Sequence, residues 1–318
     1  MKICESWLRS LINTDISTEQ LASQLTMAGL EVDAISPVAG NFEGVYVAEV
    51  VETKPHPEAD KLTICLVEAG DNEPHSIICG ASNVRAGLKV ALAKLGATLP
   101  GGFKIKKAKL RGQPSLGMLC SSSELGLEEK SDGIMELPSN APVGQDLRTY
   151  MQLDDNMLDV DLTPNRADCF SHLGIAREIA AIAGLTLNEF LPNPIQEQTR
   201  ETKIVEIIEP EVCLQYYGRV FTNINTEATT PLWLAERLRR SGIRPIHPVV
   251  DVTNYVMMAI GQPMHAFDTT KIDGKISVRF ARDQESLKLL DGQLIKLNSQ
   301  NLVIADEHKV LALAGVMG

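Results

Sequence analysis

Closely spaced glycines divide residues 44–147 into short apolar runs, and this punctuation constrains the fold more than any other feature of the chain. The runs, rich in valine, isoleucine and leucine, lie at 45–51, 63–68, 76–79 and 89–93. Many short strands joined by tight glycine turns are typical of a small barrel or sandwich. The stretch also has about the length of one domain. We therefore predict an all-β domain over residues 40–149.

The sequence on either side of this stretch has a different, helical texture. Ser17-Thr-Glu-Gln20 has the pattern of a capping box, and apolar residues then recur at helical spacing until Gly29. Residues 30–38 are expected to be extended. After the all-β stretch, residues 153–163 alternate like a strand, and a helix follows that runs to Gly184, with Asp168 as its possible N-cap. We predict that residues 1–39 and 150–190 form one small split α/β domain, interrupted by the all-β domain.

The remaining sequence indicates a third domain. Residues 191–202 form a polar, proline-containing linker, and residues 203–318 mix a helix with hairpins. The helix begins with Pro231 at N1 and ends near Gly242, with Arg237 and Arg240 expected on its outer face. Asp291-Gly292 predicts a hairpin turn. The last residues are apolar and lack a cap, so we expect this domain to be truncated. The predicted fold class is a multidomain α+β chain.

The sign of the charge reverses inside the all-β stretch. Residues 81–115 contain eight basic residues and no Asp or Glu, although the chain has a formal net charge of -11. A basic block in an acidic chain favours a local polyanionic partner, and a solvated lysine-rich face is the alternative that charge alone leaves open. Aromatic residues make up 4% of the chain, so stacking on bases is not indicated. The candidate contact residues are Lys104, Lys106, Lys107, Lys109 and Arg111.

The sequence contains no complete catalytic or metal-binding motif. GxSxG, Walker, HExxH and strand-linked GxGxxG patterns are absent. The six cysteines are scattered without a CxxC, which argues for free thiols and against a zinc site. His265 lies in a polar turn, where it could be structural or act as a general base, and His56 could stabilise a loop. Residues 251–254 could line a pocket or simply cap and turn the backbone.

Longer motifs resemble known families. HPEADKL (56–62), CGASN (79–83) and KLRGQPSLGMLCSSSELGL (109–127) resemble the EMAP II-like tRNA-binding OB-fold. TPNRADCFSHLGIAREI (163–179) and PVVDVTNYVMMAIGQPMHAFD (248–268) resemble the β subunit of bacterial phenylalanyl-tRNA synthetase. The motifs occur in family order over essentially the whole chain. The resemblance therefore implies an OB-fold barrel at 40–149 and the N-terminal part of a B3/B4 editing domain at 203–318.

The resemblance also implies an activity and partners. The family enzyme attaches phenylalanine to tRNA(Phe) with ATP and Mg2+, as a heterotetramer of two α and two β subunits. Its α subunit holds the aminoacylation site, while the β subunit binds tRNA and hydrolyses tyrosine misattached to tRNA(Phe). Because family β chains are more than twice this long, we expect residues 1–318 to be a part that neither ligates nor holds a cofactor or metal by itself. No membrane contact is expected, and the location implied is cytoplasmic.

Position by position, the resemblance implies an editing site. Its pocket residues are Arg244, Thr253, Asn254, Gln262, Pro263, Gly315 and Gly318, and His265 positions a water. Such a second sieve accepts the tyrosine hydroxyl that distinguishes the two amino acids. The family's tyrosine-reading glutamate falls beyond residue 318, so residues 1–318 are expected to edit poorly or not at all. Two alternatives remain open at this point: a standalone tRNA-binding module and a trans-editing hydrolase.

Overall fold

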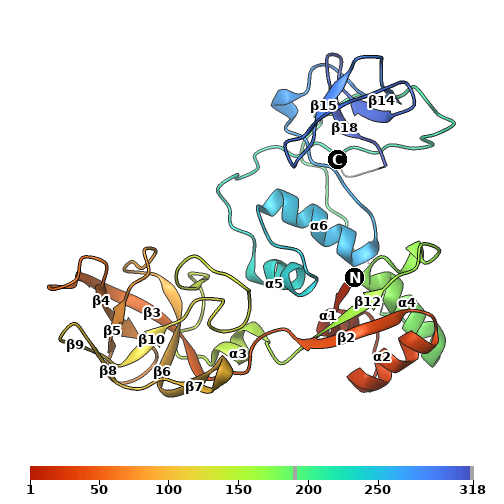
Figure 1. The fold of residues 1–318 in the computed structure, drawn as a ribbon. Coiled ribbons are helices and arrows are strands. Elements are labelled where there is room, and N and C mark those ends of the chain that lie inside the picture. The colour runs from red at the N-terminus through yellow and green to blue at the C-terminus, as the bar shows by residue number, and fades with distance from the viewer. Residues whose placement is uncertain (189–191, 316–318) are drawn as a thin grey trace. The chain divides into compact units, whose positions relative to one another are not determined.

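The computed structural model describes residues 1–188 and 192–315, which form two compact units (Figure 1). Unit 1 contains Met1–Asn188 and two later segments, Ala235–Arg244 and Met258–Gly261. Unit 2 contains Glu189–Leu234, Pro245–Met257 and Gln262–Gly318. The chain therefore returns twice from its second half into the first compact unit, which no sequence pattern indicated.

Unit 1 begins with a small sheet that joins segments from both sides of the all-β stretch. Its antiparallel strands lie in the order β1 (Lys2–Cys4), β12 (Asn156–Asp161) and β2 (Glu31–Pro37). Three helices share one apolar core with this sheet: α1 (Glu5–Leu11), α2 (Thr18–Met27) and α4 (His172–Ala183). Pairing of β2 with β12 thus closes one core from residues more than a hundred positions apart in sequence.

The helix ends test the sequence reading of this region. At α2 the Ser17 hydroxyl accepts a hydrogen bond from the Gln20 amide, and the Gln20 side chain accepts one from the Ser17 amide, so the predicted capping box is confirmed. At α4 the predicted N-cap was wrong. The cap is Ser171, whose hydroxyl accepts from the Gly174 amide at 3.0 Å, whereas Asp168 lies in the preceding 3-10 turn η2 (Ala167–Cys169). Helix α1 was not predicted.

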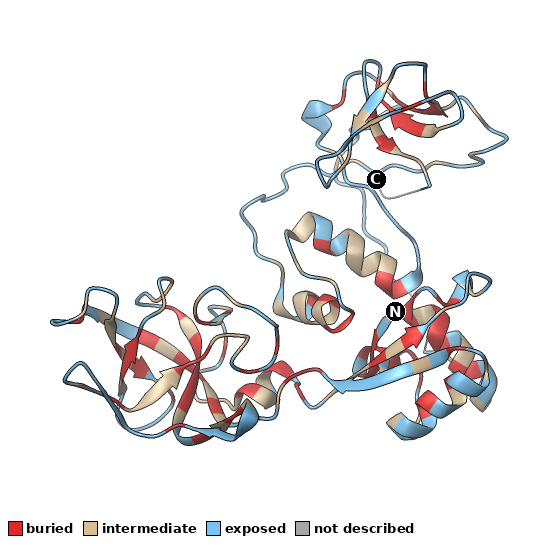
Figure 2. Ribbon diagram, in the orientation of Figure 1, coloured by how far each residue is buried: buried red, intermediate tan, exposed pale blue. Residues whose placement is uncertain are grey.

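The all-β stretch forms a seven-stranded sheet with the path β10-β6-β3-β4-β5, and β7 and β11 also pair with β6. Its apolar core is built from alternate side chains such as Val50, Cys65, Ile77 and Leu92, all fully buried (Figure 2). A separate hairpin, β8–β9, packs against β5 through β9. Strand bounds are β3 (Glu43–Pro55), β4 (Thr63–Glu68), β5 (His75–Cys79), β6 (Lys89–Leu99), β7 (Phe103–Lys104), β8 (Ala108–Leu110), β9 (Gln113–Ser115), β10 (Gly117–Leu119) and β11 (Glu136–Leu137). The 3-10 turn η1 (Pro100–Gly102) precedes β7, and helix α3 (Leu147–Met151) follows the sheet. We refer to this sheet and hairpin as the barrel.

Unit 2 is built on a four-stranded sheet with the order β13-β14-β17-β18, in which only β13 and β14 are parallel. The strands are β13 (Val205–Ile207), β14 (Ile276–Phe280), β17 (Leu302–Ala305) and β18 (Val310–Leu313). A second pair, β15 (Ser286–Lys288) and β16 (Leu294–Lys296), forms the hairpin that Asp291-Gly292 predicted, which is confirmed. The 3-10 turn η3 (Thr269–Lys271) lies before β14.

Helices α5 (Leu232–Arg240) and α6 (Pro248–Ile260) differ from the sequence reading. Arg240 was expected on the outer face of α5, but it is 5% exposed and hydrogen-bonded within unit 1, so that expectation was wrong. Residues 251–254 do not form a turn; they lie inside α6, where Asp251 is fully buried. The Asp251 carboxylate accepts from the Ile246 amide at 2.8 Å and from the Thr230 hydroxyl.

All six cysteines are free thiols, and five of them are buried, as expected from their spacing. Burial raises the pKa of the Cys120 thiol to about 12, which makes this thiol a poor nucleophile. Among the described residues, no helix combines the length and apolar character needed to cross a bilayer.

Candidate nucleic-acid interface and editing site

The eight cations of residues 81–115 fall into two groups. Three of them are neutralised by acidic side chains of the barrel: Arg85 with Glu136 at 2.8 Å, Lys89 with Glu49 at 2.6 Å, and Lys94 with Asp71 at 2.7 Å. The Lys94 ammonium, hydrogen-bonded to Asp71, lowers the pKa of that carboxyl group. The positive charge of this group is therefore locally balanced and leaves little for an external anion.

The other five cations are Lys104, Lys106, Lys107, Lys109 and Arg111, all exposed, and we call them the basic strip. Within residues 1–188 and 192–315, no acidic side chain forms an ion pair with any of them. They lie within eight consecutive positions, 104–111. An extended chain rises about 3.3 Å per residue. The strip therefore offers uncompensated positive charge along an extended edge of the barrel.

Local contacts hold this edge in place. Between β7 and β8 the strip is anchored through Ile105, whose amide donates to the Ala97 carbonyl at 2.8 Å. Hairpin β8–β9 turns at Arg111 and Gly112, which have φ angles of 46° and 86°. Positive φ at both central residues is the signature of the tight turn that fits the twist of paired strands. Arg111 adopts this left-handed conformation without being glycine, so the turn carries a charge at some conformational cost.

Two buried polar residues fix the hairpin to the rest of the barrel. The Ser115 hydroxyl accepts from the Ile78 amide and donates to the Gly117 carbonyl, each at 3.1 Å. The Nδ1 atom of His56 accepts from the Glu58 amide, so Nε2 carries the proton and donates to the Leu110 carbonyl at 3.2 Å. The prediction that His56 stabilises a loop is confirmed, while the role of Ser115 was missed.

Sequence reasoning also missed Phe103. Its ring is 61% exposed and it immediately precedes Lys104, the first residue of the basic strip. Gly101 and Gly102 before it both have positive φ, so a tight turn presents this ring at the surface. An exposed aromatic ring beside cations is what a stacked, unpaired base requires. The available signal was position rather than composition: an aromatic residue after Pro-Gly-Gly and next to a lysine.

The barrel also has an open pocket of about 350 Å³, lined by residues that include Cys79, Met118, Ser121 and Glu124. The Glu124 carboxylate already accepts 2.7 Å hydrogen bonds from both the amide and the hydroxyl of Ser121. These polar groups of the pocket thus satisfy one another, and the pocket contains none of the site residues predicted from the sequence.

The predicted editing residues occupy three separate segments. Thr253 and Asn254 lie half-buried on α6, and the Thr253 hydroxyl donates to the Val250 carbonyl at 2.7 Å. Gln262, Pro263 and His265 are exposed on the segment after α6. The side-chain amide of Gln262 donates to the neighbouring Pro263 carbonyl at 3.3 Å.

One apolar cluster links two of these segments within unit 2. The His265 ring stacks on Phe267 with a centroid separation of 6.1 Å. Phe267 and Ala314 both pack against a core that includes Ile276 and Ile304. Gly315, with a φ of 75°, directly follows Ala314 and has open space where a Cβ would stand. The structure thus brings the surroundings of His265 and Gly315 onto one core.

The remaining predicted positions are not gathered there. Arg244 is exposed and belongs to unit 1, and Gly318 lies outside the described residues. Asp168, Cys169 and Glu178 are close enough to suggest a metal site among the described residues. However, the Arg166 guanidinium already pairs with Asp168 at 3.2 Å and with Glu178 at 2.7 Å. A resident cation occupies the position that a metal ion would need, so this cluster does not fit a metal.

Comparisons with known proteins match two regions of the chain to family models. Residues 45–146 match the "Putative tRNA binding domain" family model, and residues 212–318 match the "B3/4 domain" model. Two relatives named phenylalanine–tRNA ligase beta subunit, from Legionella pneumophila (strain Lens) and Idiomarina loihiensis, are 58% and 56% identical to this chain. Each match covers 100% of this chain, and the chain spans 40% of the length of these relatives.

A solved structure titled "Crystal Structure of C-terminal Domain of Plasmodium vivax p43" aligns with 32% of this chain and 57% of its own. The sequence identity is 23% and the TM-score is 0.24.

Proposed function

We propose that this chain, which belongs to the phenylalanine–tRNA ligase β-subunit family, contacts the tRNA backbone through its basic strip and contributes to a site that removes misattached tyrosine. The observation that carries the first part is the division of the cations. Of eight cations in one block, the three at Arg85, Lys89 and Lys94 are paired with acids, and the five of the strip are exposed. Structural lysines would be expected to show the first pattern throughout.

The chemistry of the strip fits a phosphate backbone. Lysine and arginine neutralise phosphates and release condensed counterions, so binding weakens linearly in log–log terms as salt rises. Side chains on an extended edge can follow a strand of phosphates, and Phe103 offers a face on which an unpaired base can stack. The OB-fold implied by the resemblance is a fold on which such binding is common. The five strip residues supply positioning contacts, which carry no sequence information by themselves.

The strip can be tested with a matched set of substitutions. Changing all five strip residues to Gln should make the negative slope of log affinity against log salt for tRNA(Phe) shallower by about 3.5–4.5. Each lost phosphate contact removes about 0.7–0.9 from the magnitude of this slope. The control changes the three paired cations, Arg85, Lys89 and Lys94, to Gln and should leave the slope almost unchanged. Equal slopes for the strip variant and the unmodified chain would rule out backbone contact by the strip.

For editing, we assign His265 to the water that attacks the ester. The water oxygen would bond to the carbonyl carbon, the bond to the ribose oxygen would break, and the proton would pass through His265 to that leaving oxygen. Thr253, Asn254, Gln262, Pro263 and Gly315, all in unit 2, would shape the pocket. Support comes from the B3/4 match over residues 212–318 and from the core that Phe267 and Ala314 share.

The whole enzyme is also a proposal, because the chain spans 40% of its relatives' length. We propose that it works with an α subunit in a heterotetramer of two α and two β subunits in the cytoplasm, and that ATP and Mg2+ serve ligation there. Affinity purification of the natural protein, followed by mass determination, tests this directly. A smaller synthetase subunit should co-purify; its absence would favour a free-standing tRNA-binding or trans-editing protein.

A further inference from the structure

The barrel joins the rest of unit 1 through two chain connections. Residues 38–40 lead from β2 into the barrel, and residues 151–155 lead from α3 back to β12. The two connections touch, because the Val38 amide donates to the Asp155 carbonyl at 3.1 Å. A domain that is joined to its neighbour by two adjacent chain connections can pivot about them unless further contacts prevent it. We refer to these two segments as the barrel connections.

An arginine of α3 bridges the two connections. The Arg148 guanidinium donates to the Gly40 carbonyl at 2.9 Å and to the Leu153 carbonyl at 3.3 Å. It also pairs with Asp154 at 2.6 Å. Its contacts with Leu153 and Asp154 are local in sequence, whereas its contact with Gly40 reaches the first connection from 108 positions away.

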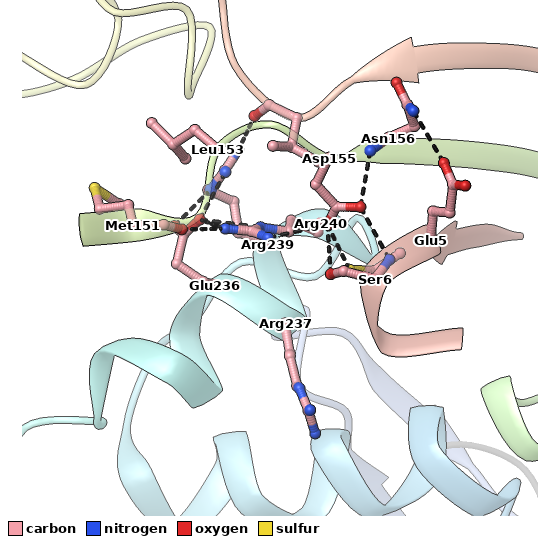
Figure 3. A network of polar contacts seen from close by, with 12 residues as sticks. Glu5, Ser6, Met151, Leu153, Asp155, Asn156, Glu236, Arg237, Arg239 and Arg240 are labelled. Carbon is pink, nitrogen blue, oxygen red and sulfur yellow. Dashed lines mark hydrogen bonds and ion pairs between the residues drawn. The ribbon is translucent and has the colours of Figure 1, made fainter. Parts of the chain in front are cut away.

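Two more arginines reach the same connections from α5, more than eighty residues further along the chain (Figure 3). Arg239 donates through Nη1 to the carbonyls of Val38 and Leu127, both at 2.9 Å. Arg240 donates through Nη2 to the Met151 carbonyl at 2.7 Å. The first arginine therefore holds the first connection together with a loop of the barrel, and the second arginine holds the second connection.

The charges in this group balance one another. Glu236 on α5 accepts from both arginines, with a two-pronged contact to Arg239 at 2.8 Å for each pair of atoms. Arg240 pairs with Asp155 at 3.0 Å, and the two side chains are 6% and 5% exposed. Asp155 also accepts from the amide of Ser6 at 2.9 Å. One buried arginine, Arg240, and one partly buried arginine, Arg239, face two acids, so the group has no spare charge for a ligand.

Such a group contributes more to geometry than to stability. Burying charges costs desolvation energy that roughly cancels their attraction, so a buried ion pair adds little net free energy. The rigid guanidinium fork, by contrast, satisfies several acceptors only in one relative orientation. Carbonyl groups of both connections are bound in this way. An arrangement of this kind restricts a pivot.

We propose that Arg239 and Arg240 are positioning residues that lock the barrel connections and so hold the basic strip in one direction within unit 1. A consequence for tRNA rests on the proposed function: a strip held in advance loses less conformational freedom when it binds. The lock is supplied by α5, within the stretch that matches the B3/4 domain model. The region that matches one family model thereby restrains the domain that matches the other.

Distance measurements on the 318-residue chain test the lock without tRNA. Spin labels are placed on exposed positions of α2 and of the barrel, as Ser23→Cys and Asn72→Cys, with Cys213→Ser to remove the one thiol that is not buried. The pulsed-EPR distance distribution should be narrow, and at least twice as wide in Arg239→Met/Arg240→Met. The control Arg279→Met breaks the Arg279–Glu285 pair of unit 2, which is 8% and 19% exposed, and should leave the width unchanged.

An unchanged width in a folded double variant would overturn the proposal. Because that variant leaves Glu236 and Asp155 without their cations, it could fail to fold. A second variant that adds Glu236→Gln and Asp155→Asn removes the unpaired charges and is judged by the same criterion. A third, Arg239→Lys, keeps the charge but loses the fork, and it should give an intermediate width.

Binding of tRNA(Phe) then separates this proposal from the proposed function. The double variant should bind about threefold to tenfold more weakly, because its mobile barrel loses conformational freedom when it binds. The salt slope should be unchanged, because the phosphate contacts remain. The five-residue strip variant should do the reverse, with a lower slope and an unchanged distance distribution. If no variant binds tRNA, the proposed function fails while the distance result still decides the lock.

Discussion

The basic strip and the predicted editing residues are built in different ways. The strip lies within eight consecutive positions, 104–111, on an edge that Ile105, Ser115 and His56 fix to the barrel. The editing residues lie on α6, on the segment after it and near Gly315, and Arg244 belongs to the other unit. A charged contact surface needs only a rigid frame and exposed ends. A pocket needs walls, and its walls come from distant parts of a chain.

Burial shows the same contrast. The barrel encloses its own core, with Val50, Ile77 and Leu92 fully buried. In unit 2 the segment between β13 and α5 leaves large apolar side chains exposed, including Leu214 at 84%, Tyr217 at 84% and Phe221 at 65%. The barrel strands therefore bury their apolar side chains, whereas this segment of unit 2 leaves many of its own at the surface.

The largest expected effect is on the editing rate, and it tests whether the exposed His265 acts in hydrolysis. In the complete enzyme, His265→Ala should lower the hydrolysis rate of tyrosyl-tRNA(Phe) about 10²–10⁴-fold, because a positioned base contributes that much. The free energy of unfolding should change by less than about 0.5 kcal/mol, since the side chain is exposed. His308→Ala, at another exposed histidine of unit 2, is the control for both measurements. Full editing activity in His265→Ala would remove His265 from the mechanism.

Lowering the pH should destabilise unit 1 before unit 2. Burial lowers the pKa of His172, in unit 1, from 6.5 to about 4. The hydrogen bond to the Met258 carbonyl opposes this lowering in part, and the nearby Arg237 charge adds a smaller lowering of the same pKa. The Nδ1–H group donates to that carbonyl at 2.9 Å and Nε2 accepts from the Cys4 amide at 3.1 Å, so the ring is neutral when folded. The unfolded chain then binds more protons below pH 6.5, and stability falls from there toward pH 4.

The expected loss for unit 1 is about 3 kcal/mol, from about 1.4 kcal/mol per pKa unit. In unit 2, the hydrogen bond from Arg279 lowers the pKa of Glu285 from 4.5, so that pair weakens only below pH 4.5. Urea denaturation at several pH values between 7 and 4.5, with hydrogen exchange as the readout for each unit, should show that the stability of unit 1 falls first. The variant His172→Phe should lack this pH dependence. Equal loss in both units would contradict the assignment.

A smaller effect tests the frame of the strip. Ser115→Ala should destabilise the barrel by about 1–3 kcal/mol, because the buried Ile78 amide loses its acceptor. Affinity for tRNA(Phe) should fall with it, although no charge is changed. Urea denaturation followed by circular dichroism measures the first effect, and the exposed substitution Ser82→Ala serves as the control. An unchanged midpoint in Ser115→Ala would mean that the hairpin is held by other contacts.

The smallest expected effect separates charge from conformation at the turn. Arg111→Asn should change the free energy of unfolding by less than about 1 kcal/mol, since asparagine tolerates the left-handed conformation that Arg111 adopts with a φ of 46°. The salt slope for tRNA(Phe) should fall by about 0.7–0.9, the contribution of one phosphate contact. Isothermal titration at several salt concentrations measures it. A slope equal to that of the unmodified chain would limit the strip to its four lysines.

Local signals in the sequence sufficed for several parts of this protein. The capping box at Ser17, the hairpin at Asp291-Gly292 and the strands of the barrel depend on neighbouring residues, and the structure confirms them. The basic strip was found for the same reason, since its five cations lie within eight consecutive positions, 104–111. Longer motifs identified the family, and the comparisons agree with that identification.

Tertiary structure decided which charges are free and which are used. Arg240 and Arg85 look alike in sequence, yet one is buried against Asp155 and the other pairs with Glu136 at the surface. The N-cap of α4 is Ser171 and not Asp168, whose carboxylate pairs with Arg166. The acidic partners of Arg85 and Arg240 lie 51 and 85 positions away, so no local pattern records those two pairs. Charge and propensity belong to the sequence, whereas the pairing of a charge depends on the distances that folding creates.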